Sequence, residues 1–383
     1  MTENTVDAVE MAQALIRCES VTPHDDGALD LLEKTLTNLG FTCQRLPFSE
    51  DGTPDIDNLY ARRGTSSPNL CFAGHSDVVP VGNVDAWADN PFAATIRDGK
   101  LYGRGSSDMK GAVAAFVAAA SRHSADDLSG SLSLLITGDE EGPAINGTRK
   151  VIEALDAKGE KIDFCIVGEP TNPNIMGEMI KIGRRGSMNM RLTVEGVQGH
   201  VAYPHLAENP VPNLVKLLSH LKQGQFDEGT EYFQPSNLEV TALFTDAQAF
   251  NVIAGKATAL FNARFSDLHT GASISKTVSE QLDSAGIEYK LDIQIKGEAF
   301  LQEPGPLSSA LSDAVEATIG KAPELSTTGG TSDARYIKNY ADVAEFGLVG
   351  KTMHAVDEHV LVADVEALAD IYSGVITKLL AQS

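Results

Sequence analysis

The sequence predicts an α/β protein in which a mostly parallel sheet is flanked by helices, with an inserted α+β domain. In the first half of the 383 residues, short apolar runs alternate with helical patterns, as expected for βα units. From Ser187 the order of predicted elements becomes β-α-β-β-α-β, which is the ferredoxin-like unit. The length also exceeds the usual size of one hydrophobic core, which favours two domains.

The first-half elements follow from composition. Residues 111–122 are rich in alanine and contain no helix breaker, so they predict a helix, and residues 147–157 predict another. Apolar runs at 70–74, 132–138 and 164–168 predict strands.

The insertion follows from a change of pattern. Its predicted strands are residues 187–195, 238–244, 257–265 and 288–295, and its predicted helices are residues 210–223 and 272–284. After residue 297 the chain returns to a helix at 307–319, a glycine-rich turn at 328–333, a strand at 343–346 and a final helix from about 364.

Charge and composition exclude several classes of partner. The chain has 30 Lys and Arg against 53 Asp and Glu, a net charge of −23, whereas nucleic acids and anionic membranes require a basic face. The longest apolar stretch, residues 112–120, is far shorter than the roughly 20 residues of a membrane-spanning helix. The acidic residues 1–11 predict no targeting segment. The 4 scattered cysteines, with no C-x-x-C pair, predict reduced thiols and a cytoplasmic location.

Metal-binding side chains follow apolar runs in five separate segments. They are His75 with Asp77, Asp108, Glu140 with Glu141, Glu169, and His354. Ligands of open α/β sheets bind outside the carboxyl ends of the strands, so the sequence predicts one site built from five loops. Carboxylate oxygens and imidazole nitrogens without thiolate suit zinc, cobalt or manganese in an open catalytic site.

Spacing indicates a division of labour within this site. His75 and Asp77 are two residues apart, as on one face of a strand, so Asp77 is a candidate to hold the imidazole of a metal-bound His75. Adjacent Glu140 and Glu141 point in different directions, which lets one bind metal and the other act as a general base. If Asp108 bridges, two metals can each have three protein ligands.

The chain resembles the dinuclear zinc peptidases and deacylases that include aminoacylases and glutamate carboxypeptidases. The segments that carry the resemblance span almost the whole chain: GHSDVVP at 74–80, YGRGSSDMKG at 102–111, DEEG at 139–142, VGEPT at 167–171, GRRGS at 183–187, GHVAYPH at 199–205, GGTSD at 329–333 and MH at 353–354.

The resemblance implies a zinc-peptidase-like catalytic domain of residues 1–182 and 297–383, with residues 183–296 as an inserted dimerisation (lid) domain. It implies one zinc on His75, Asp108 and Glu169, and a second on Asp108, Glu141 and His354, with cobalt as an alternative metal. Glu140 would be the base, Asp77 would orient His75, and His200 would reach the site of a neighbouring protomer. The implied substrate-binding residues are Arg184, Tyr203, Asn251, Arg264, Gly330 and Thr331.

The segments at Arg184, His200 and Thr331 narrow the expected activity. They imply a homodimeric amide hydrolase that cleaves N-succinyl-L,L-2,6-diaminopimelate to succinate and L,L-2,6-diaminopimelate. The alternatives are deacetylation of acetylornithine, aminoacylase or dipeptidase activity, a binding protein that has lost the metals, and a hydrolase that uses a pair of carboxylates without metal. Ala254 and Asp357 depart from the expected pattern, and the resemblance implies a cis peptide between Asp108 and Met109.

Overall fold

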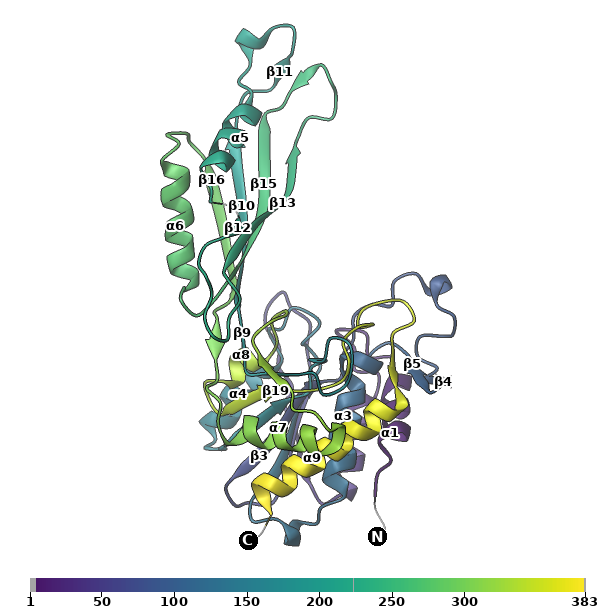
Figure 1. Ribbon diagram of the computed structural model, residues 1–383. Helices are drawn as coiled ribbons and strands as arrows, with labels where there is room; N and C mark the ends of the chain where they lie inside the picture. The colour runs from purple at the N-terminus through teal and green to yellow at the C-terminus, as the bar shows by residue number, and fades with distance from the viewer. Residues whose placement is uncertain (1–4, 223, 382–383) are drawn as a thin grey trace. The chain divides into compact units, whose positions relative to one another are not determined.

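The computed structural model describes residues 5–222 and 224–381, which divide into two compact units. The first, here the metal unit, comprises the chain up to Ile182, Gln302–Ser326, and the chain from Ser332 onward. The second, here the inserted unit, comprises Gly183–Leu301 and Thr327–Thr331. The metal unit is therefore discontinuous in sequence, and its two parts are drawn in purple to blue and in yellow-green to yellow in Figure 1.

An eight-stranded sheet forms the centre of the metal unit. Its order is β1-β2-β6-β3-β7-β19-β8-β18. The central pairs β6–β3, β3–β7 and β7–β19 are parallel, whereas β1–β2, β2–β6 and β19–β8 are antiparallel. The bounds are β1 Thr42–Arg45, β2 Asn58–Arg63, β3 Asn69–His75, β6 Ser131–Thr137, β7 Phe164–Val167, β8 Met179–Lys181, β18 Glu324–Ser326 and β19 Asp342–Glu345.

The central strands are covered on both faces. Every residue of β3 and β6 is buried, although the side chains of a strand alternate between its two faces. Near-continuous apolar runs are typical of such doubly covered parallel strands. The predicted α/β class with a mostly parallel central sheet is confirmed.

Helices cover the sheet of the metal unit. They are α1 Ala8–Arg17, α2 Ala28–Asn38, α3 Gly111–Ser121, α4 Thr148–Ala157, α7 Pro306–Ile319, α8 Ala334–Ile337 and α9 Val362–Leu380. Helix α3 contacts both α1 and α9, and α9 also contacts α7. Every residue of α3 is buried, because its alanines let three helices approach closely. Phe72 of β3, Phe116 of α3 and Tyr372 of α9 pack their rings together at centroid distances of 4.7, 5.7 and 5.6 Å.

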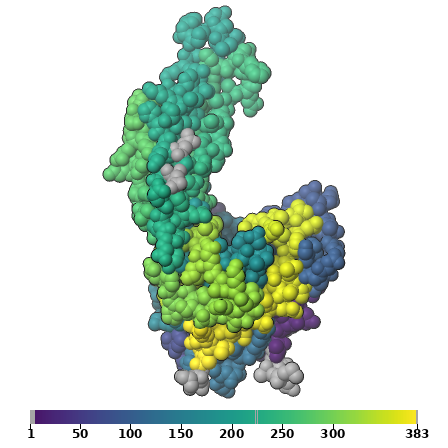
Figure 2. All heavy atoms as spheres, in the orientation of Figure 1, coloured from purple at the N-terminus to yellow at the C-terminus, as the bar shows by residue number. Residues whose placement is uncertain are grey.

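A small sheet joins distant parts of the metal unit. It has the order β20-β5-β4, with β4 Thr95–Arg97, β5 Lys100–Tyr102 and β20 His359–Leu361. Short helical turns at η1 Val84–Ala86, η2 Ser106–Lys110 and η3 Ala125–Asp127 complete the metal unit. Figure 2 shows the surface consequence of this pairing, where blue atoms of the first third of the chain adjoin yellow atoms of its end.

The inserted unit has the element order expected from the sequence. Its sheet, β12-β13-β15-β10-β16, and its two long helices give the order β10-α5-β13-β15-α6-β16. The bounds are β9 Gly183–Arg184, β10 Gly186–Glu195, β11 Gly199–His200, η4 Pro204–Leu206, α5 Pro210–His220, β12 Gly224–Gln225, β13 Asn237–Thr245, β14 Val252–Ile253, β15 Lys256–Phe265, α6 Gly271–Asp283, β16 Lys290–Gly297 and β17 Phe300–Leu301. Alternate residues of β10 and β15 form a core with one face of each helix.

The boundaries between the two units differ slightly from the expected ones. The inserted unit extends to Leu301, whereas the sequence put the boundary at 296, because β17 pairs with β9 at the start of the unit. Thr327–Thr331 also group with the inserted unit. Arg184 donates hydrogen bonds to the carbonyls of Thr328 and Gly330, which ties this turn to β9. Within the described residues, no helix is long and apolar enough to cross a membrane.

Candidate metal centre

The expected metal ligands lie at one edge of the central sheet. His75 is the last residue of β3, Glu140 and Glu141 follow β6, and Glu169 follows β7. Since β6, β3 and β7 are parallel neighbours, their carboxyl ends share an edge. Asp108 comes from the turn η2 ahead of α3, and His354 from the loop before β20.

Asp108 lies between the two histidines. Its Oδ1 is 3.1 Å from His75 Nε2, and its Oδ2 is 3.3 Å from His354 Nε2. His354 Nε2 is also 2.8 Å from Glu141 Oε1. The two oxygens of one carboxylate thus face two different imidazoles, which is the arrangement that a bridging ligand requires.

The remaining carboxylates close the cluster. One donor atom each of His75, Glu140 and Glu169 lie within 4.8 Å of one another, and the same holds for His75, Asp108 and Glu141. The structure therefore brings all five expected ligands and the expected base, Glu140, together within the metal unit.

Asp77 contacts its neighbours differently from the expectation. His75 Nδ1 lies 2.8 Å from the main-chain carbonyl oxygen of Asp77, whereas the Asp77 carboxylate is 3.6 Å away. That carboxylate instead accepts hydrogen bonds from the amides of Glu140 and Glu141, at 3.3 and 3.1 Å. The strand ends at His75, so the alternation that put both side chains on one face does not extend to Asp77. Asp77 therefore holds the imidazole through its main chain and the Glu140–Glu141 loop through its side chain.

The imidazoles carry raised pKa values. Burial alone would lower the pKa of His75, but the hydrogen bond and charge of Asp108, with the charges of Asp77 and Glu140, raise it well above its usual value. Hydrogen bonds to Asp108 and Glu141 raise the pKa of His354 to about 10. Burial would raise the pKa of Asp108, yet the hydrogen bonds and charges of His354 and His75 lower it. Positive charge is thus favoured around Asp108.

The pKa values of the surrounding carboxyls are raised, in contrast to that of Asp108. Burial and the nearby Asp333 raise the pKa of Glu140 to about 8, and burial raises that of Asp77 to about 6. Burial, with the charges of Asp108 and Glu140, raises the pKa of Glu169 well above its usual value. Ionised carboxylates this close together repel one another, and two imidazoles carry too little positive charge to neutralise them. The cluster therefore favours bound cations.

The donor set fits divalent metal ions. Four carboxylates and two imidazoles, with no thiolate, converge at interatomic spacings that one or two ions could span. His75, Asp108 and Glu169 could hold one ion, and Asp108, Glu141 and His354 a second. The peptide bond between Asp108 and Met109 is cis, as the resemblance implies.

Two supporting groups were not singled out by the sequence pattern. Asp139 accepts hydrogen bonds from the amides of Ala144, Ile145 and Asn146, which shapes the loop after the two glutamates. The buried pair Arg104 and Glu358 lies behind Asp108 and His354. Asp139 and Arg104 are inside segments that carry the resemblance, but only the folded chain shows what they contact.

Several expected substrate-binding residues lie near the start of the inserted unit. Arg184 is buried beside the turn that contains Gly330 and Thr331, and Arg264 pairs with Ser187 across β15 and β10. Burial lowers the pKa of Arg185, and the positive charge of Arg264 lowers it further. The guanidinium groups of Arg185 and Arg264 thus lie close enough to interact in a strongly acidic chain, which suits an anionic ligand.

The remaining candidates lie elsewhere in the inserted unit. His200 is in β11 and is exposed, with its ring 5.9 Å from that of Tyr203. Its Nδ1 accepts a hydrogen bond from the amide of Ala202, so a neutral ring carries its proton on Nε2. Asn251 lies beside this segment, since its carbonyl accepts a hydrogen bond from the amide of Val201.

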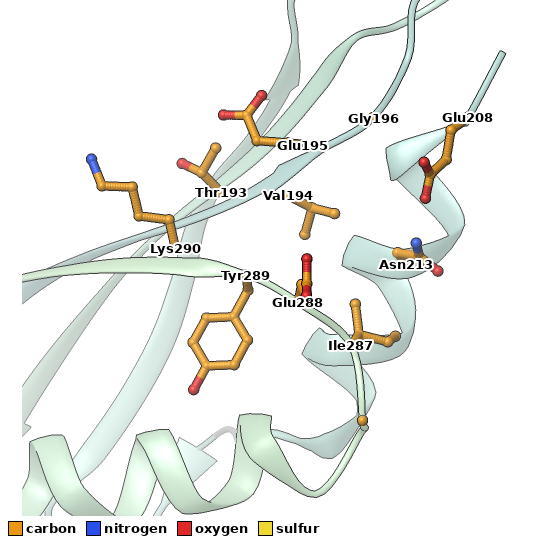
Figure 3. A pocket seen from close by; sticks show the side chains of 11 residues that line it. Thr193, Val194, Glu195, Gly196, Glu208, Asn213, Ile287, Glu288, Tyr289 and Lys290 are labelled. Carbon is orange, nitrogen blue, oxygen red and sulfur yellow. The ribbon is translucent and has the colours of Figure 1, made fainter.

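A cavity in the inserted unit is separate from all these candidates. It has a volume of about 630 Å³ and lies among the end of β10, the helix α5 and the segment 286–290. Figure 3 shows its lining, which includes Glu195, Glu208, Glu288 and Lys290. None of the residues expected at the site lines it.

Two residues, Asp357 and Ala254, depart from the expected sequence pattern. Asp357 has a left-handed φ of 55°, a conformation that Asn and Asp tolerate well, and its Oδ1 accepts a hydrogen bond from the amide of Ala88. Ala254 is buried between β14 and β15. Neither is among the clustered side chains.

Two relatives that are more than 50% identical to this chain share one description. The pattern of peptidase family M20/M25/M40 matches residues 71–378. A succinyl-diaminopimelate desuccinylase of Parvibaculum lavamentivorans is 58% identical over 374 residues, 97% of this chain and 95% of the relative. A protein of the same description from Rhodospirillum centenum is 54% identical over 377 residues, 98% of each chain.

Solved structures agree with the fold. A metallo-carboxypeptidase of the M20 family from Sulfolobus solfataricus superposes with a TM-score of 0.78 at 18% identity, covering 97% of this chain and 99% of that one. A dinuclear metal-binding peptidase of the M20 family from Bacillus subtilis gives a TM-score of 0.68 at 14% identity, covering 97% and 96%.

Replacement of Asp139 is expected to loosen the loop that follows the two glutamates. Asp139→Ala removes a charged acceptor from three amides, which should lower the free energy of unfolding by about 2 to 3 kcal/mol. Hydrogen exchange should accelerate at residues 144–146. The exposed Asp55→Ala is the control, and unchanged protection in Asp139→Ala would contradict the assignment.

Proposed function

The chain belongs to peptidase family M20/M25/M40, and we propose that it is a metal-dependent amide hydrolase that cleaves N-succinyl-L,L-2,6-diaminopimelate to succinate and L,L-2,6-diaminopimelate. The single observation that carries the hydrolase assignment is the position of Asp108 between two imidazoles, with Glu140 in the same cluster. The substrate assignment draws on relatives that are more than 50% identical over nearly the whole chain.

The proposed cofactor is a pair of zinc ions, with cobalt as an alternative. His75, Asp108 and Glu169 would hold one ion, and Asp108, Glu141 and His354 the other. Bound metals of this kind polarise the scissile carbonyl and make water a stronger nucleophile at neutral pH. The convergence of these donors and the uncompensated charge of the carboxyls support this proposal.

Glu140 is the proposed general base. Its carboxylate takes a proton from the attacking water and delivers it to the nitrogen of the leaving amine, so one group serves both halves of the reaction. Burial and the charge of Asp333 raise the pKa of Glu140 to about 8, and the positive charge of bound cations would lower it toward the range in which a general base works at neutral pH. Asp77 supports it through the hydrogen bonds to the amides of Glu140 and Glu141.

The carboxylate groups of the substrate require positive partners. Arg184, Arg264 and the turn with Gly330 and Thr331 are proposed to hold them, together with Tyr203 and Asn251. The support is the gathering of guanidinium groups in the inserted unit of a chain with net charge −23. Guanidinium groups bind carboxylates through paired, charge-assisted hydrogen bonds.

A homodimer formed through the inserted unit is also proposed. Strand β12 pairs only with Asn237 and Leu238 of β13, so among described residues no strand partner covers 239–245 on that edge. Leu243 and Phe244 of this strand and Val211 and Val215 of α5 are exposed. Open sheet edges and grouped apolar side chains are typical of association surfaces. The proposed location is the cytoplasm, consistent with four free cysteines.

Substrate choice tests the proposed activity. The enzyme should hydrolyse succinyl-diaminopimelate and discriminate against acetyl-diaminopimelate and acetylornithine by a factor of up to about 10⁴ in kcat/KM, because unpaired cationic donors penalise a substrate that lacks the terminal carboxylate. Steady-state kinetics on zinc-loaded protein measure this ratio. Comparable kcat/KM for acetylornithine would overturn the substrate and leave the hydrolase.

The two adjacent glutamates should differ on replacement. Glu140→Gln should retain both metals and lose nearly all turnover, because an amide cannot accept the proton from water. Glu141→Gln should lose metal, because Glu141 is a proposed ligand beside His354 and an amide binds divalent metal more weakly than a carboxylate. Metal analysis beside turnover numbers separates the two, and two active variants with full metal content would refute the division.

His200 is proposed to stabilise the developing oxyanion of a neighbouring protomer through its Nε2–H. His200→Ala should lower kcat by about a hundred- to a thousandfold, the usual loss for one oxyanion donor, with metal content unchanged. Mixed dimers of Glu140→Gln and His200→Ala chains should recover part of the activity. Absence of recovery in demonstrated mixed dimers would argue against action between protomers.

A further inference from the structure

A buried ion pair, Arg104 and Glu358, bonds the main chain of two segments that carry expected metal ligands. Arg104 Nη1 is 2.6 Å from Glu358 Oε2, and the two residues are 2% and 0% exposed. Removing two charges from water is costly unless further hydrogen bonds compensate. Both residues of this pair make such additional hydrogen bonds.

Glu358 holds the main chain that carries Asp108. Its second oxygen, Oε1, accepts hydrogen bonds from the amides of Ser107 at 2.9 Å and Asp108 at 3.2 Å. These amides belong to the turn η2, where Asp108 and Met109 leave helical geometry. A fixed amide restricts where the Asp108 carboxylate can point.

Arg104 reaches the segment that carries His354. Its Nη1 donates to the carbonyl of Ala355 at 3.3 Å, and its Nη2 donates to the carbonyls of His354 and Pro80 at 3.4 Å each. Its guanidinium also lies 5.2 Å from the centre of the Trp87 ring. The planar guanidinium group of arginine has enough N–H donors in fixed directions for the carboxylate and the three carbonyls, whereas the ammonium group of a lysine has fewer donors than these four acceptors need.

From these contacts we infer that Arg104 and Glu358 are positioning residues that set the spacing between Asp108 and His354, and thereby the affinity of the metal these two share with Glu141. The inference rests on the proposed function, because it presupposes two metals. The other proposed metal also uses Asp108, but it depends less on the pair, since its ligand His75 is held by the strand β3 and by the carbonyl of Asp77.

The size of the effect follows from how metal sites respond to loss of such support. Groups that hold the ligands, without touching the metal, typically change metal affinity by 10- to 100-fold when they are removed. A purely structural pair would instead change stability and leave metal affinity unaltered. Stability and second-metal affinity must therefore be measured separately.

The double variant Arg104→Met/Glu358→Met makes this separation. It replaces both buried charges with apolar side chains, so no unpaired charge is left buried. The amides and carbonyls that the pair bonded lose their partners, so the metal-free protein should stay folded but unfold at a lower temperature than the wild type. Zinc titration should show a first equivalent with affinity within about threefold of the wild type and a second weakened by at least about 10-fold. The visible spectrum of the second cobalt(II) equivalent should also change.

The matched control replaces another ion pair of the metal unit. Arg62 and Glu160 are partly buried and contact no candidate ligand, so Arg62→Met/Glu160→Met should bind both zinc equivalents as the wild type does. Two wild-type affinities in the double variant at Arg104 and Glu358 would overturn the inference. A wild-type protein that binds fewer than two metals would instead refute the proposed function on which it rests.

A second variant keeps the test decisive if the double variant does not fold. Arg104→Lys retains a positive charge opposite Glu358, but one ammonium group cannot bond the carboxylate and three carbonyls together. It should weaken the second zinc by about 10-fold while the first changes little. Unchanged affinity for the second zinc in a folded Arg104→Lys protein would also overturn the positioning role.

Discussion

The accumulation of negative charge at one edge of the central sheet is the constraint on which the site depends. Asp77, Glu140 and Glu169 all have raised pKa values because they are buried together, and the positive charge of His75 offsets this rise only in part. Carboxylates so placed favour bound cations, since isolated charges are costly to remove from water. The same crowding that would destabilise a metal-free interior makes this edge suited to two divalent ions.

Metal ligands on loops need rigid support. In the metal unit, the same kind of hydrogen bond supplies it at three places. Three buried carboxylates that are not proposed ligands accept hydrogen bonds from main-chain amides of ligand-bearing or adjoining segments. Asp77 holds Glu140 and Glu141, Asp139 holds residues 144–146, and Glu358 holds Ser107 and Asp108. Such bonds to a charged acceptor are stronger than those between neutral groups. The ligands therefore depend on a layer of acids that need never contact a metal.

The inserted unit provides a different electrostatic environment. Arg184, Arg185 and Arg264 lie near its start, and burial together with the charge of Arg264 lowers the pKa of Arg185. The chain as a whole has net charge −23, so a group of three arginines differs from the acidic composition of the rest of the protein. The metal unit therefore contains a cluster of acids, whereas the inserted unit contains a group of cations at its start.

The sequence by itself determined the fold class, the order of elements in the insertion and the residues of the metal cluster. It could do so because apolar runs mark parallel strands, and because polar residues directly after such runs meet at one sheet edge. The contacts of Asp77, Arg104 and Glu358 were decided only by tertiary structure. So was the grouping of Thr327–Thr331 with the inserted unit. These features depend on hydrogen bonds between residues as many as 254 positions apart, and no local periodicity or spacing carries that information.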